Sequence, residues 1–445
     1  MHTARARLFL AAALLWAVGP GRLVAQSPYT FSTIAGAPLV AGTNDGPGSI
    51  AKFNTPAGIA HDRDGNLYVA DTFNQVIRQI QPGATNWTVS TIVGLVTNAG
   101  SVDGYGSKAR LNRPDGLVVD QAGNMFFSDR NNATVRKITR VGTNWLVTTI
   151  AGSGHNGGAD GTNNDASFWL PSGVAVDPVG NVYLADASNF TIRKISPQGT
   201  NWVTTTIAGE LQVYGSNDAT GTNAHFNYVR GIAMDRSGNL FVTDFGNSTI
   251  RKLTPSPNGW VVTTPVGVPG VSGTNDGINN NALFNSPVGI TCDGAGNLYV
   301  TDWSNSTIRK VAPVGSDWVV TTLGGRPTSA GTNDGPGSVA RFNKPWGVDV
   351  DDGKLLYIVD YLNSTIRMGL APLLTPPPLQ IRLSGDQAVL SWPISAPGFT
   401  LQTANAPKSN AAWSPVTNAI ATNVNSFSVT NAWQNGQGFY RLHNP

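Results

Sequence analysis

A tetrapeptide that recurs six times constrains the fold of this chain more than any other feature. It reads T-I-A-G or a close variant, and its copies begin at Thr33, Thr91, Thr149, Thr206, Thr264 and Thr322. Successive copies lie 57 or 58 residues apart. A repeat of this length is one supersecondary unit that packs on copies of itself, so the chain is a repeat protein before any residue is assigned a chemical role.

Each unit contains four short segments with the pattern of β-strands. In the fifth unit they are V-G-I-T-C-D, L-Y-V-T-D, T-I-R-K-V and W-V-V-T-T. They are rich in Val, Ile, Thr and aromatic residues, alternate with a period of two, and are separated by Gly, Asn, Asp and Pro. The repeat shows no apolar spacing typical of a helix. The pattern therefore predicts an all-β protein with four strands in each unit.

The positions of the aromatic residues predict that the units close into a ring. In five units a Trp precedes the tetrapeptide by four residues, at Trp87, Trp145, Trp202, Trp260 and Trp318. The sixth unit ends near Ala371 after its third strand, whereas Tyr29 stands four residues before Thr33. We expect segment 28–36 to supply the missing strand. That pairing closes a six-bladed β-propeller and removes two exposed strand edges.

Further motifs inside the units resemble those of the NHL repeat family of six-bladed propellers. They include G-I-A-H-D at 58–62 with D-G-N-L-Y-V-A-D at 64–71, and similar pairs at 173–186 and 231–244. The resemblance covers roughly residues 28–371 and implies a propeller over 26–371. These units are longer than most propeller repeats, and the extra residues lie between the T-I-A-G strand and the next G-I-A strand.

The first 25 residues have the pattern of a secretory leader, with Arg5 and Arg7, an apolar stretch, a break at 19–21 and a cleavage position at Ala25. We therefore expect an exported monomer, in the periplasm, on the cell surface or outside the cell. The apolar stretch is too short for a membrane span. Without the leader the chain has 26 basic and 26 acidic residues. This balance argues against nucleic acid as a partner.

The composition changes after Ala371. A Pro-rich segment at 372–378 predicts a semi-rigid linker, and residues 379–445 alternate again, which predicts a small antiparallel, β-sandwich-like domain. The domain resembles short C-terminal β modules of secreted bacterial proteins. That resemblance implies attachment or surface association.

Two charged positions recur in all six units, and we expect them to build the blades. An Asp at the end of each second strand, followed seven residues later by an Arg, predicts a local ion pair at a turn. The Asp residues are Asp71, Asp129, Asp186, Asp244, Asp302 and Asp360. The Arg residues are Arg78, Arg136, Arg193, Arg251, Arg309 and Arg367. A recurrent Gly at 58, 116, 173, 231, 289 and 347 predicts close backbone approach in the innermost strand.

Acidic loops between the blades could bind a metal ion. G-T-N-D-G at 42–46, 273–277 and 331–335 offers the oxygen atoms that calcium prefers. None of these loops fits the twelve-residue calcium loop, and turns require the same residues. We expect no cofactor, with calcium as the alternative.

Function is expected where the sixfold symmetry breaks. Three consecutive units carry an aromatic residue after the repeated Asp, namely Phe245, Trp303 and Tyr361, where an earlier unit has Arg130. Beside the innermost Gly positions lie Arg113, Asp115, Tyr228, Arg230, Lys344 and Trp346. Aromatic faces with cations nearby predict a platform for a glycan, peptide or protein partner. The alternative is that these rings only cover loop backbone.

Two other functions remain open. Related six-bladed propellers include lactonases and lyases that hold a metal in the channel. In this chain the only histidines of the propeller, His61, His155 and His225, occupy non-equivalent positions. A carboxylate centre would need Asp115 and Asp349 with an amide such as Asn112 or Asn285. The third possibility is a structural surface component tethered by its C-terminal domain. The single cysteine, Cys292, lies in an apolar column and is expected to pack. A non-catalytic binding protein is the leading hypothesis.

Overall fold

A computed structural model defines the arrangement of most of the chain. It describes residues 28–83, 86–351, 355–372, 379–384, 387–393, 400–404, 414–416, 420–422, 426–432 and 439–443. The predicted leader at 1–25 and nearly all of the predicted linker at 372–378 lie outside the described residues. The chain divides into a propeller unit, Pro28–Leu373, and a second unit that contains Leu374–Pro445.

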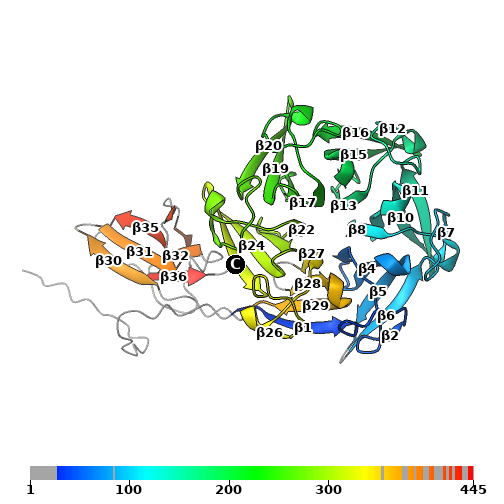
Figure 1. Cartoon of the computed structure of the whole chain (residues 1–445). Coiled ribbons are helices and arrows are strands. Elements are labelled where there is room, and N and C mark those ends of the chain that lie inside the picture. The colour runs from blue at the N-terminus through cyan, green and yellow to red at the C-terminus, as the bar shows by residue number, and fades with distance from the viewer. Residues whose placement is uncertain are drawn as a thin grey trace, which may run out of the picture. The chain divides into compact units, whose positions relative to one another are not determined.

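The propeller unit is a ring of six antiparallel sheets (Figure 1). Each sheet, or blade, has four main strands, numbered from the innermost outward. Blades 1 to 3 contain β3 (Ile59–His61), β4 (Leu67–Asp71), β5 (Val76–Pro82) and β6 (Trp87–Val93); β8 (Pro114–Val119), β9 (Met125–Asp129), β10 (Thr134–Val141) and β11 (Asn144–Ala151); and β13 (Pro171–Val176), β14 (Val182–Asp186), β15 (Thr191–Gln198) and β16 (Asn201–Ala208).

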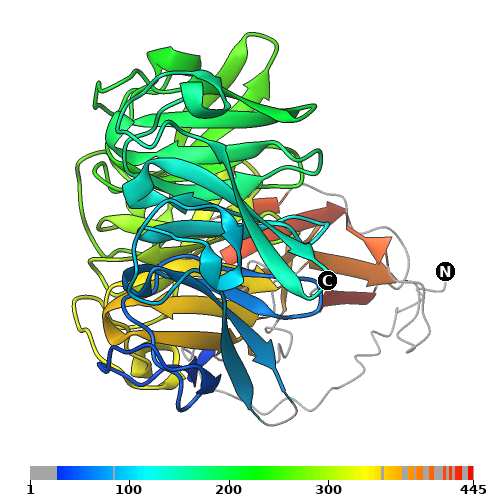
Figure 2. The same ribbon diagram turned by 90° about the vertical axis from the view of Figure 1, so that its right-hand side faces the viewer.

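Blades 4 to 6 repeat this order. They contain β17 (Val229–Met234), β18 (Leu240–Asp244), β19 (Thr249–Ser256) and β20 (Gly259–Val266); β22 (Pro287–Cys292), β23 (Leu298–Asp302), β24 (Thr307–Val314) and β25 (Asp317–Gly324); and β27 (Pro345–Asp351), β28 (Leu355–Asp360), β29 (Thr365–Leu370) and β1 (Thr30–Ala35). Short 3-10 turns are η1 (Thr72–Asn74), η2 (Gly106–Lys108), η3 (Arg130–Asn132), η4 (Asn163–Asp165), η5 (Ala187–Asn189), η6 (Gly221–Asn223), η7 (Asn279–Asn281), η8 (Gly337–Val339) and η9 (Tyr361–Asn363). Figure 2 shows the blades from the side.

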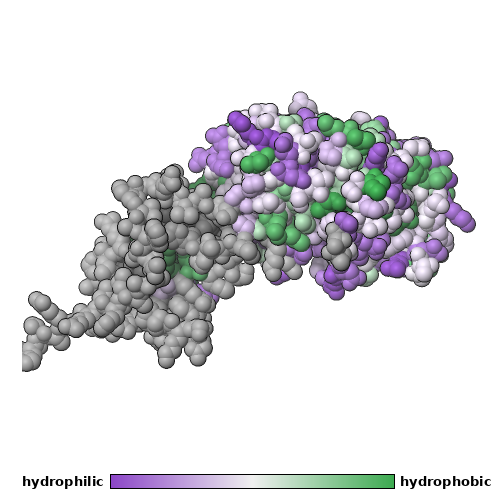
Figure 3. Space-filling model, turned by 90° about the horizontal axis from the view of Figure 1, so that it is seen from below, coloured by the Kyte–Doolittle hydropathy of each residue, from purple (hydrophilic) through white to green (hydrophobic). Residues whose placement is uncertain are grey.

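Five blades have a short fifth strand that the sequence pattern did not predict. These two-residue strands are β2 (Gly46–Pro47), β7 (Gly104–Tyr105), β12 (Gly161–Thr162), β21 (Gly277–Ile278) and β26 (Gly335–Pro336). In blade 4 a single bridge between Thr220 and Val261 takes their place. The residues belong to the long loop that follows the T-I-A-G strand. The extra length of the repeat thus covers part of the outer edge of each blade, which protects that edge from other strands. Figure 3 shows one side of the propeller, where apolar residues form small, separate patches among hydrophilic ones.

The first strand closes the propeller, as predicted. Strand β1 lies between β26 and β29 and pairs antiparallel with β29, so that Phe31 faces Gly369 and Thr33 faces Arg367. The sixth blade is therefore built from both ends of the propeller segment.

Aromatic side chains join each blade to the one before it. The outer-strand Trp of a blade packs edge-on against an aromatic ring on the second strand of the preceding blade, for example Trp145 against Tyr68 with centroids 5.9 Å apart. The other pairs are Trp202 with Phe126, Trp260 with Tyr183, Trp318 with Phe241, and Trp87 with Tyr357. Tyr29 takes the position of the missing Trp and forms a side-chain hydrogen bond with Tyr299.

Buried ion pairs stabilise the turns of every blade. In blade 1, Arg78 Nη1 donates to Asp71 Oδ2 at 2.9 Å, and both side chains are fully buried. Asn74 donates to the same carboxylate oxygen. Arg78 Nη2 also pairs with Asp45 at 2.6 Å, and Asp45 in turn accepts hydrogen bonds from the backbone and hydroxyl of Thr91. The same arrangement recurs in the other five blades.

The loop carboxylates that suggest calcium binding in the sequence are therefore engaged by arginine and threonine. These residues are Asp45, Asp276 and Asp334, and the equivalent Asp103, Asp160 and Asp218 of the other blades are paired in the same way. Within the described residues, no group of three or more His, Cys, Asp or Glu side chains is placed to hold a metal ion.

The innermost glycines make the close contacts that the sequence predicted. A Cβ atom on Gly116 would meet the carbonyl oxygen of Ser172 in the next blade, and one on Gly289 would meet that of Trp346. The same contact runs across the closure, from Gly347 to Ala57. Each innermost strand thus lies against its neighbour at the position where a side chain is absent.

The C-terminal unit contains two small antiparallel sheets. One has the order β30 (Gln380–Ser384), β31 (Gln387–Pro393), β35 (Ser426–Ala432) and β34 (Ile420–Thr422), and the other β33 (Ser414–Pro415), β32 (Thr400–Ala404) and β36 (Phe439–His443). Among the described residues, no helix is long and apolar enough to cross a membrane.

Candidate functional site

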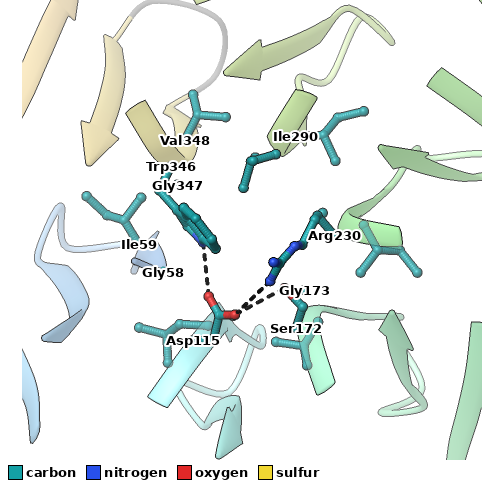
Figure 4. Close-up of a pocket in the computed structure, with 17 residues that line it drawn as sticks. Gly58, Ile59, Asp115, Ser172, Gly173, Arg230, Ile290, Trp346, Gly347 and Val348 are labelled. Carbon is teal, nitrogen blue, oxygen red and sulfur yellow. Dashed lines mark hydrogen bonds and ion pairs between the residues drawn. The ribbon is translucent and has the colours of Figure 1, made fainter. Parts of the chain in front are cut away.

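The residue before each innermost glycine lies at one end of the central channel, which we call the channel mouth. The six positions hold Ala57, Asp115, Ser172, Arg230, Val288 and Trp346. Five of them, all except Ala57, line a cavity of about 70 Å³ together with the glycines (Figure 4). Because the residue before the innermost glycine differs in every blade, the mouth is chemically asymmetric although its backbone repeats.

The backbone that leads to the mouth is held in an unusual conformation. Arg113, Tyr228 and Lys344 have φ angles of 56°, 61° and 56°. Residues other than glycine adopt this left-handed region rarely, because their Cβ crowds the backbone. Side chains of the preceding blade hold the turn: the N–H of Arg113 donates to Gln75 Oε1 at 2.6 Å, and that of Lys344 donates to Ser306 Oγ at 3.4 Å.

Asp115 is the centre of the polar contacts at the mouth. Its Oδ1 accepts a hydrogen bond from Trp346 Nε1 at 3.0 Å, and its Oδ2 accepts one from Ser172 Oγ at 3.1 Å. Arg130 Nη1 lies 3.5 Å and Arg230 Nη1 lies 3.9 Å from Oδ2. The Trp346 contact joins blade 6 to blade 2 across the channel, as Figure 4 shows. The Asp115 carboxylate is thus buried but well supplied with donors.

Arg230 is enclosed by aromatic rings. Its guanidinium carbon lies 4.6 Å from the ring centroid of Tyr228, 5.5 Å from that of Phe245 and 5.1 Å from that of Trp346. The residue is 7% exposed. Burial, followed by repulsion from Arg130, lowers the pKa of Arg230 to about 10, while Asp115 opposes the decrease. The group stays charged at neutral pH.

The other predicted aromatic residues extend this cluster over blades 4 to 6. Tyr361 stacks on Trp346 with centroids 4.9 Å apart, and Trp303 lies 6.0 Å from Phe245. Lys344 Nζ lies 3.5 Å from the centroid of Trp303. Burial raises the pKa of the Tyr361 hydroxyl, with the Asp115 charge as the next cause.

Nine of the ten ligand-binding candidates therefore come together at the mouth. The exception is Arg113, which is exposed and lies over the ring of Phe73 at 4.4 Å. The five aromatic side chains are only partly buried, so part of each ring is accessible at the surface. Sequence reasoning missed Ser172, the donor to Asp115. A comparison of the six residues that precede the innermost glycines would have found it, because it is the small polar member of that set.

The opposite end of the channel holds a second cavity, of about 180 Å³, whose lining includes Asp349, Thr291 and Cys292. Asp115 and Asp349 therefore line different cavities, and the described residues do not bring the two carboxylates together as a shared metal centre would require. The two carboxylates lie three residues apart in equivalent strands, which places them at opposite ends of the channel. The backbone N–H groups of Asn112 and Asn285 donate to Asp129 and Asp302.

Asp349 instead pairs with a histidine across the closure of the propeller. His61 Nδ1 lies 2.6 Å from Asp349 Oδ2, and the N–H of His61 donates to the same oxygen at 2.7 Å. The hydrogen bond to Asp349 raises the pKa of His61 to about 9, although burial opposes the increase. The pair joins β3 of blade 1 to β27 of blade 6.

Cys292 packs against the core of blade 5, and burial, then the charges of Asp293 and Asp235, raise its thiol pKa to about 12.

This pair predicts a pH-dependent stability. The folded-state pKa of His61 exceeds its ordinary value of 6.5, so its contribution is complete below about pH 6.5 and is lost as the pH rises through about 9. The His61 side chain is 31% exposed, and solvent screening limits the contribution to about 1–2 kcal/mol. Urea denaturation at about pH 6 and about pH 10 measures this difference. We expect Asp349→Asn to reduce it and His155→Gln to leave it unchanged; an unchanged difference in Asp349→Asn contradicts the prediction.

Comparison with known proteins agrees with the repeat pattern. A family model for the NHL repeat matches residues 168–195 and 226–253. The chain is an NHL-repeat propeller. This NHL-repeat propeller is 29% identical over 288 residues to Protein SUPPRESSOR OF QUENCHING 1, chloroplastic, of Arabidopsis thaliana, a match to 61% of the chain and 26% of that protein. It is 27% identical over 301 residues to NHL repeat-containing protein 2 of Homo sapiens, a match to 60% and 40%. The match thus spans less than half the length of either relative.

Solved structures share the fold of the NHL-repeat propeller. A protein of unknown function from Bacteroides thetaiotaomicron aligns with a TM-score of 0.58 and 22% identity, over 77% of this chain and 76% of that one. An auxiliary nutrient binding protein from the same organism aligns with a TM-score of 0.57 and 18% identity, over 79% and 78%. At these identities the similarity establishes the architecture alone.

Proposed function

We propose that this protein is an exported, monomeric, non-catalytic binding protein that captures a glycan, peptide or protein partner at the channel mouth. The observation that carries the proposal is the one-sided gathering of Tyr228, Phe245, Trp303, Trp346 and Tyr361 around Arg230. In a sixfold repeat, residues that build the blade recur, whereas these residues occupy equivalent positions in only part of the ring. Partly exposed aromatic faces beside cations suit sugar rings and peptide side chains.

The polar groups of the mouth favour binding over turnover. Asp115, the buried carboxylate there, is held by Trp346 and Ser172 and lies beside two arginines. A carboxylate with this many donors is a poor general base. The use of this fold for ligand capture has a parallel, since two solved propellers of the same architecture are described as auxiliary nutrient binding proteins. Export itself rests on the leader pattern of residues 1–25.

Replacement of Trp303 tests the binding role. We expect Trp303→Ala to weaken the binding of the partner by at least about tenfold, because an aromatic anchor in the contact surface accounts for a large share of binding energy. The measurement is isothermal titration of the intact protein with extracellular polysaccharides and peptides.

Trp169→Ala is the matched control. Trp169 is a surface Trp before the innermost strand of blade 3, and it takes no part in the ring contacts that build the Arg230 cluster. The control variant is expected to bind within about twofold of the unmodified protein, because it removes a ring of the same size outside the contact surface. Unchanged binding by Trp303→Ala, or an equal loss in both variants, excludes the channel mouth as the binding surface.

A further inference from the structure

Two of the three nitrogen atoms in the buried guanidinium of Arg230 lack a hydrogen-bond acceptor among the described residues. Its Nε and Nη1 atoms are buried and donate no hydrogen bond within the described part of the chain. Its nearest acidic group, Asp115, lies 3.9 Å from Nη1, beyond hydrogen-bond distance. Asp115 directs its oxygens to Trp346 and Ser172 instead. The six blade-building arginines also have an unpaired buried Nε, whereas among the described arginines the unpaired buried Nη1 is found in Arg230 alone. A buried N–H group without an acceptor is costly, so its place beside a cavity indicates that another molecule supplies the acceptor.

The surroundings of Arg230 restrict the shape of that acceptor. Tyr228, Phe245 and Trp346 lie over the guanidinium within 4.6–5.5 Å. Aromatic faces attract a cation but offer no in-plane acceptor. The N–H groups of a guanidinium lie in one plane, and those of Nη1 and Nη2 lie side by side, where they match two oxygens of one planar group.

The size and charge of the channel mouth further restrict which chemical group can bind to Arg230. The cavity of about 70 Å³ that Arg230 and Asp115 line has room for a few heavy atoms, but not for a whole sugar ring. The cluster contains three cations, Arg130, Arg230 and Lys344, and one carboxylate, Asp115, which lies beside the two arginines. The excess positive charge favours an anion. Because Asp115 stays close to Arg230, a singly charged group meets less repulsion there than a doubly charged phosphate.

We propose that the partner bound at the channel mouth carries a carboxylate, which enters the cavity and accepts hydrogen bonds from Arg230. The remainder of the ligand lies outside the cavity against Trp346 and Tyr361, whose stacked rings form the adjacent wall. This inference rests on the proposed binding function and specifies the chemical class of its ligand. The carboxylate belongs either to an acidic sugar or to the C-terminus of a peptide.

Matched pairs of small molecules test the charge requirement separately from binding itself. The first pair is galacturonate and galactose, and the second is N-acetylphenylalanine and its amide. Isothermal titration of the full chain is expected to show at least about tenfold tighter binding of the acid in one pair, because a hydrogen bond to a charged group is lost in the neutral partner. The pair that shows the difference identifies the source of the carboxylate.

Variants assign the effect to Arg230. We expect Arg230→Gln to abolish the preference for the acid, and Arg130→Gln, a less buried replacement that keeps the cage intact, to reduce it. Arg140→Gln is the control, since Arg140 is exposed on β10, outside the innermost strand, and lies over the ring of Trp145. Equal binding of the acid and its neutral partner overturns the carboxylate inference and leaves the binding role standing. Absence of acid binding up to millimolar concentration also overturns it, and a preference that survives unchanged in Arg230→Gln does the same.

Discussion

Phe31→Ala is expected to lower the free energy of unfolding of the propeller by about 3–5 kcal/mol, the usual cost of removing a buried phenylalanine ring. Phe31 lies on β1, the strand that closes the propeller, and is 1% exposed. Its ring packs edge-on against Phe342 with centroids 5.2 Å apart and lies 6.1 Å from Tyr29. Urea denaturation of the variant measures the loss. Thr30→Ala, an exposed change on the same strand, is the control and is expected to stay within about 0.5 kcal/mol.

The size of Phe31 is compensated within the closing blade. In blade 1 the corresponding cross-strand pair is Val89 with Ile80, and the other complete blades also pair two medium-sized residues. In blade 6 the pair is Phe31 with Gly369. A Cβ on Gly369, or on Gly324 of blade 5, would meet the Phe31 ring. Strand β1 therefore carries a large residue, Phe31, which fits because Gly369 and Gly324 beside it have no side chain.

Rebuilding the pair of blade 1 in blade 6 tests this complementarity. Phe31→Val leaves a cavity and Gly369→Ile clashes with the ring, so each change alone is expected to destabilise the protein. Together they recreate the Val–Ile pair, and we expect the double variant to be at least about 1 kcal/mol more stable than the sum of the single changes predicts. If the changes in the free energy of unfolding are additive, Phe31 and Gly369 are not energetically coupled. The closure by β1 then depends on backbone pairing alone.

The architecture was predictable because the repeat shows each position six times. Six copies of the T-I-A-G strand determined the number of blades, and Tyr29 in the Trp column determined which strand closes the ring. The buried Asp–Arg pairs and the glycine contacts followed from positions that never vary. The fifth strands were not predicted, since two residues with Gly and Pro have the composition of a turn and pair only because the neighbouring strand is already in place.

The candidate site was predictable as a set of residues but not as a set of contacts. The break in symmetry selected Arg230, Trp346 and Asp115, whereas the bond from Trp346 to Asp115 crosses the channel between blades 6 and 2. Contacts between blades that are not neighbours depend on the width of the channel, which no sequence pattern gives. The His61–Asp349 pair differs, because ring closure makes blades 1 and 6 neighbours and aligns these two positions.

Gly289→Ala is expected to lower the free energy of unfolding by about 3 kcal/mol, the upper part of the usual range for overpacking. The added Cβ would meet the carbonyl oxygen of Trp346 and lie close to the N–H of Val348. Both are backbone atoms of β27, so no side-chain rotation relieves the contact and the innermost strands must separate. Thermal unfolding and urea denaturation measure the loss.

Gly123→Ala distinguishes this clash from the general cost of replacing a glycine. Gly123 has a φ of 80° and no atom within 4 Å of an added Cβ, so its replacement introduces only backbone strain, about 1–2 kcal/mol. Gly289 is not in the left-handed region, so its replacement introduces only the contact with blade 6. If Gly289→Ala costs less than Gly123→Ala, the innermost strands have room to move apart. In that case the tight packing at the glycines does not fix the backbone of the channel mouth. The positions of Trp346 and Arg230 then depend on the contacts of their own side chains.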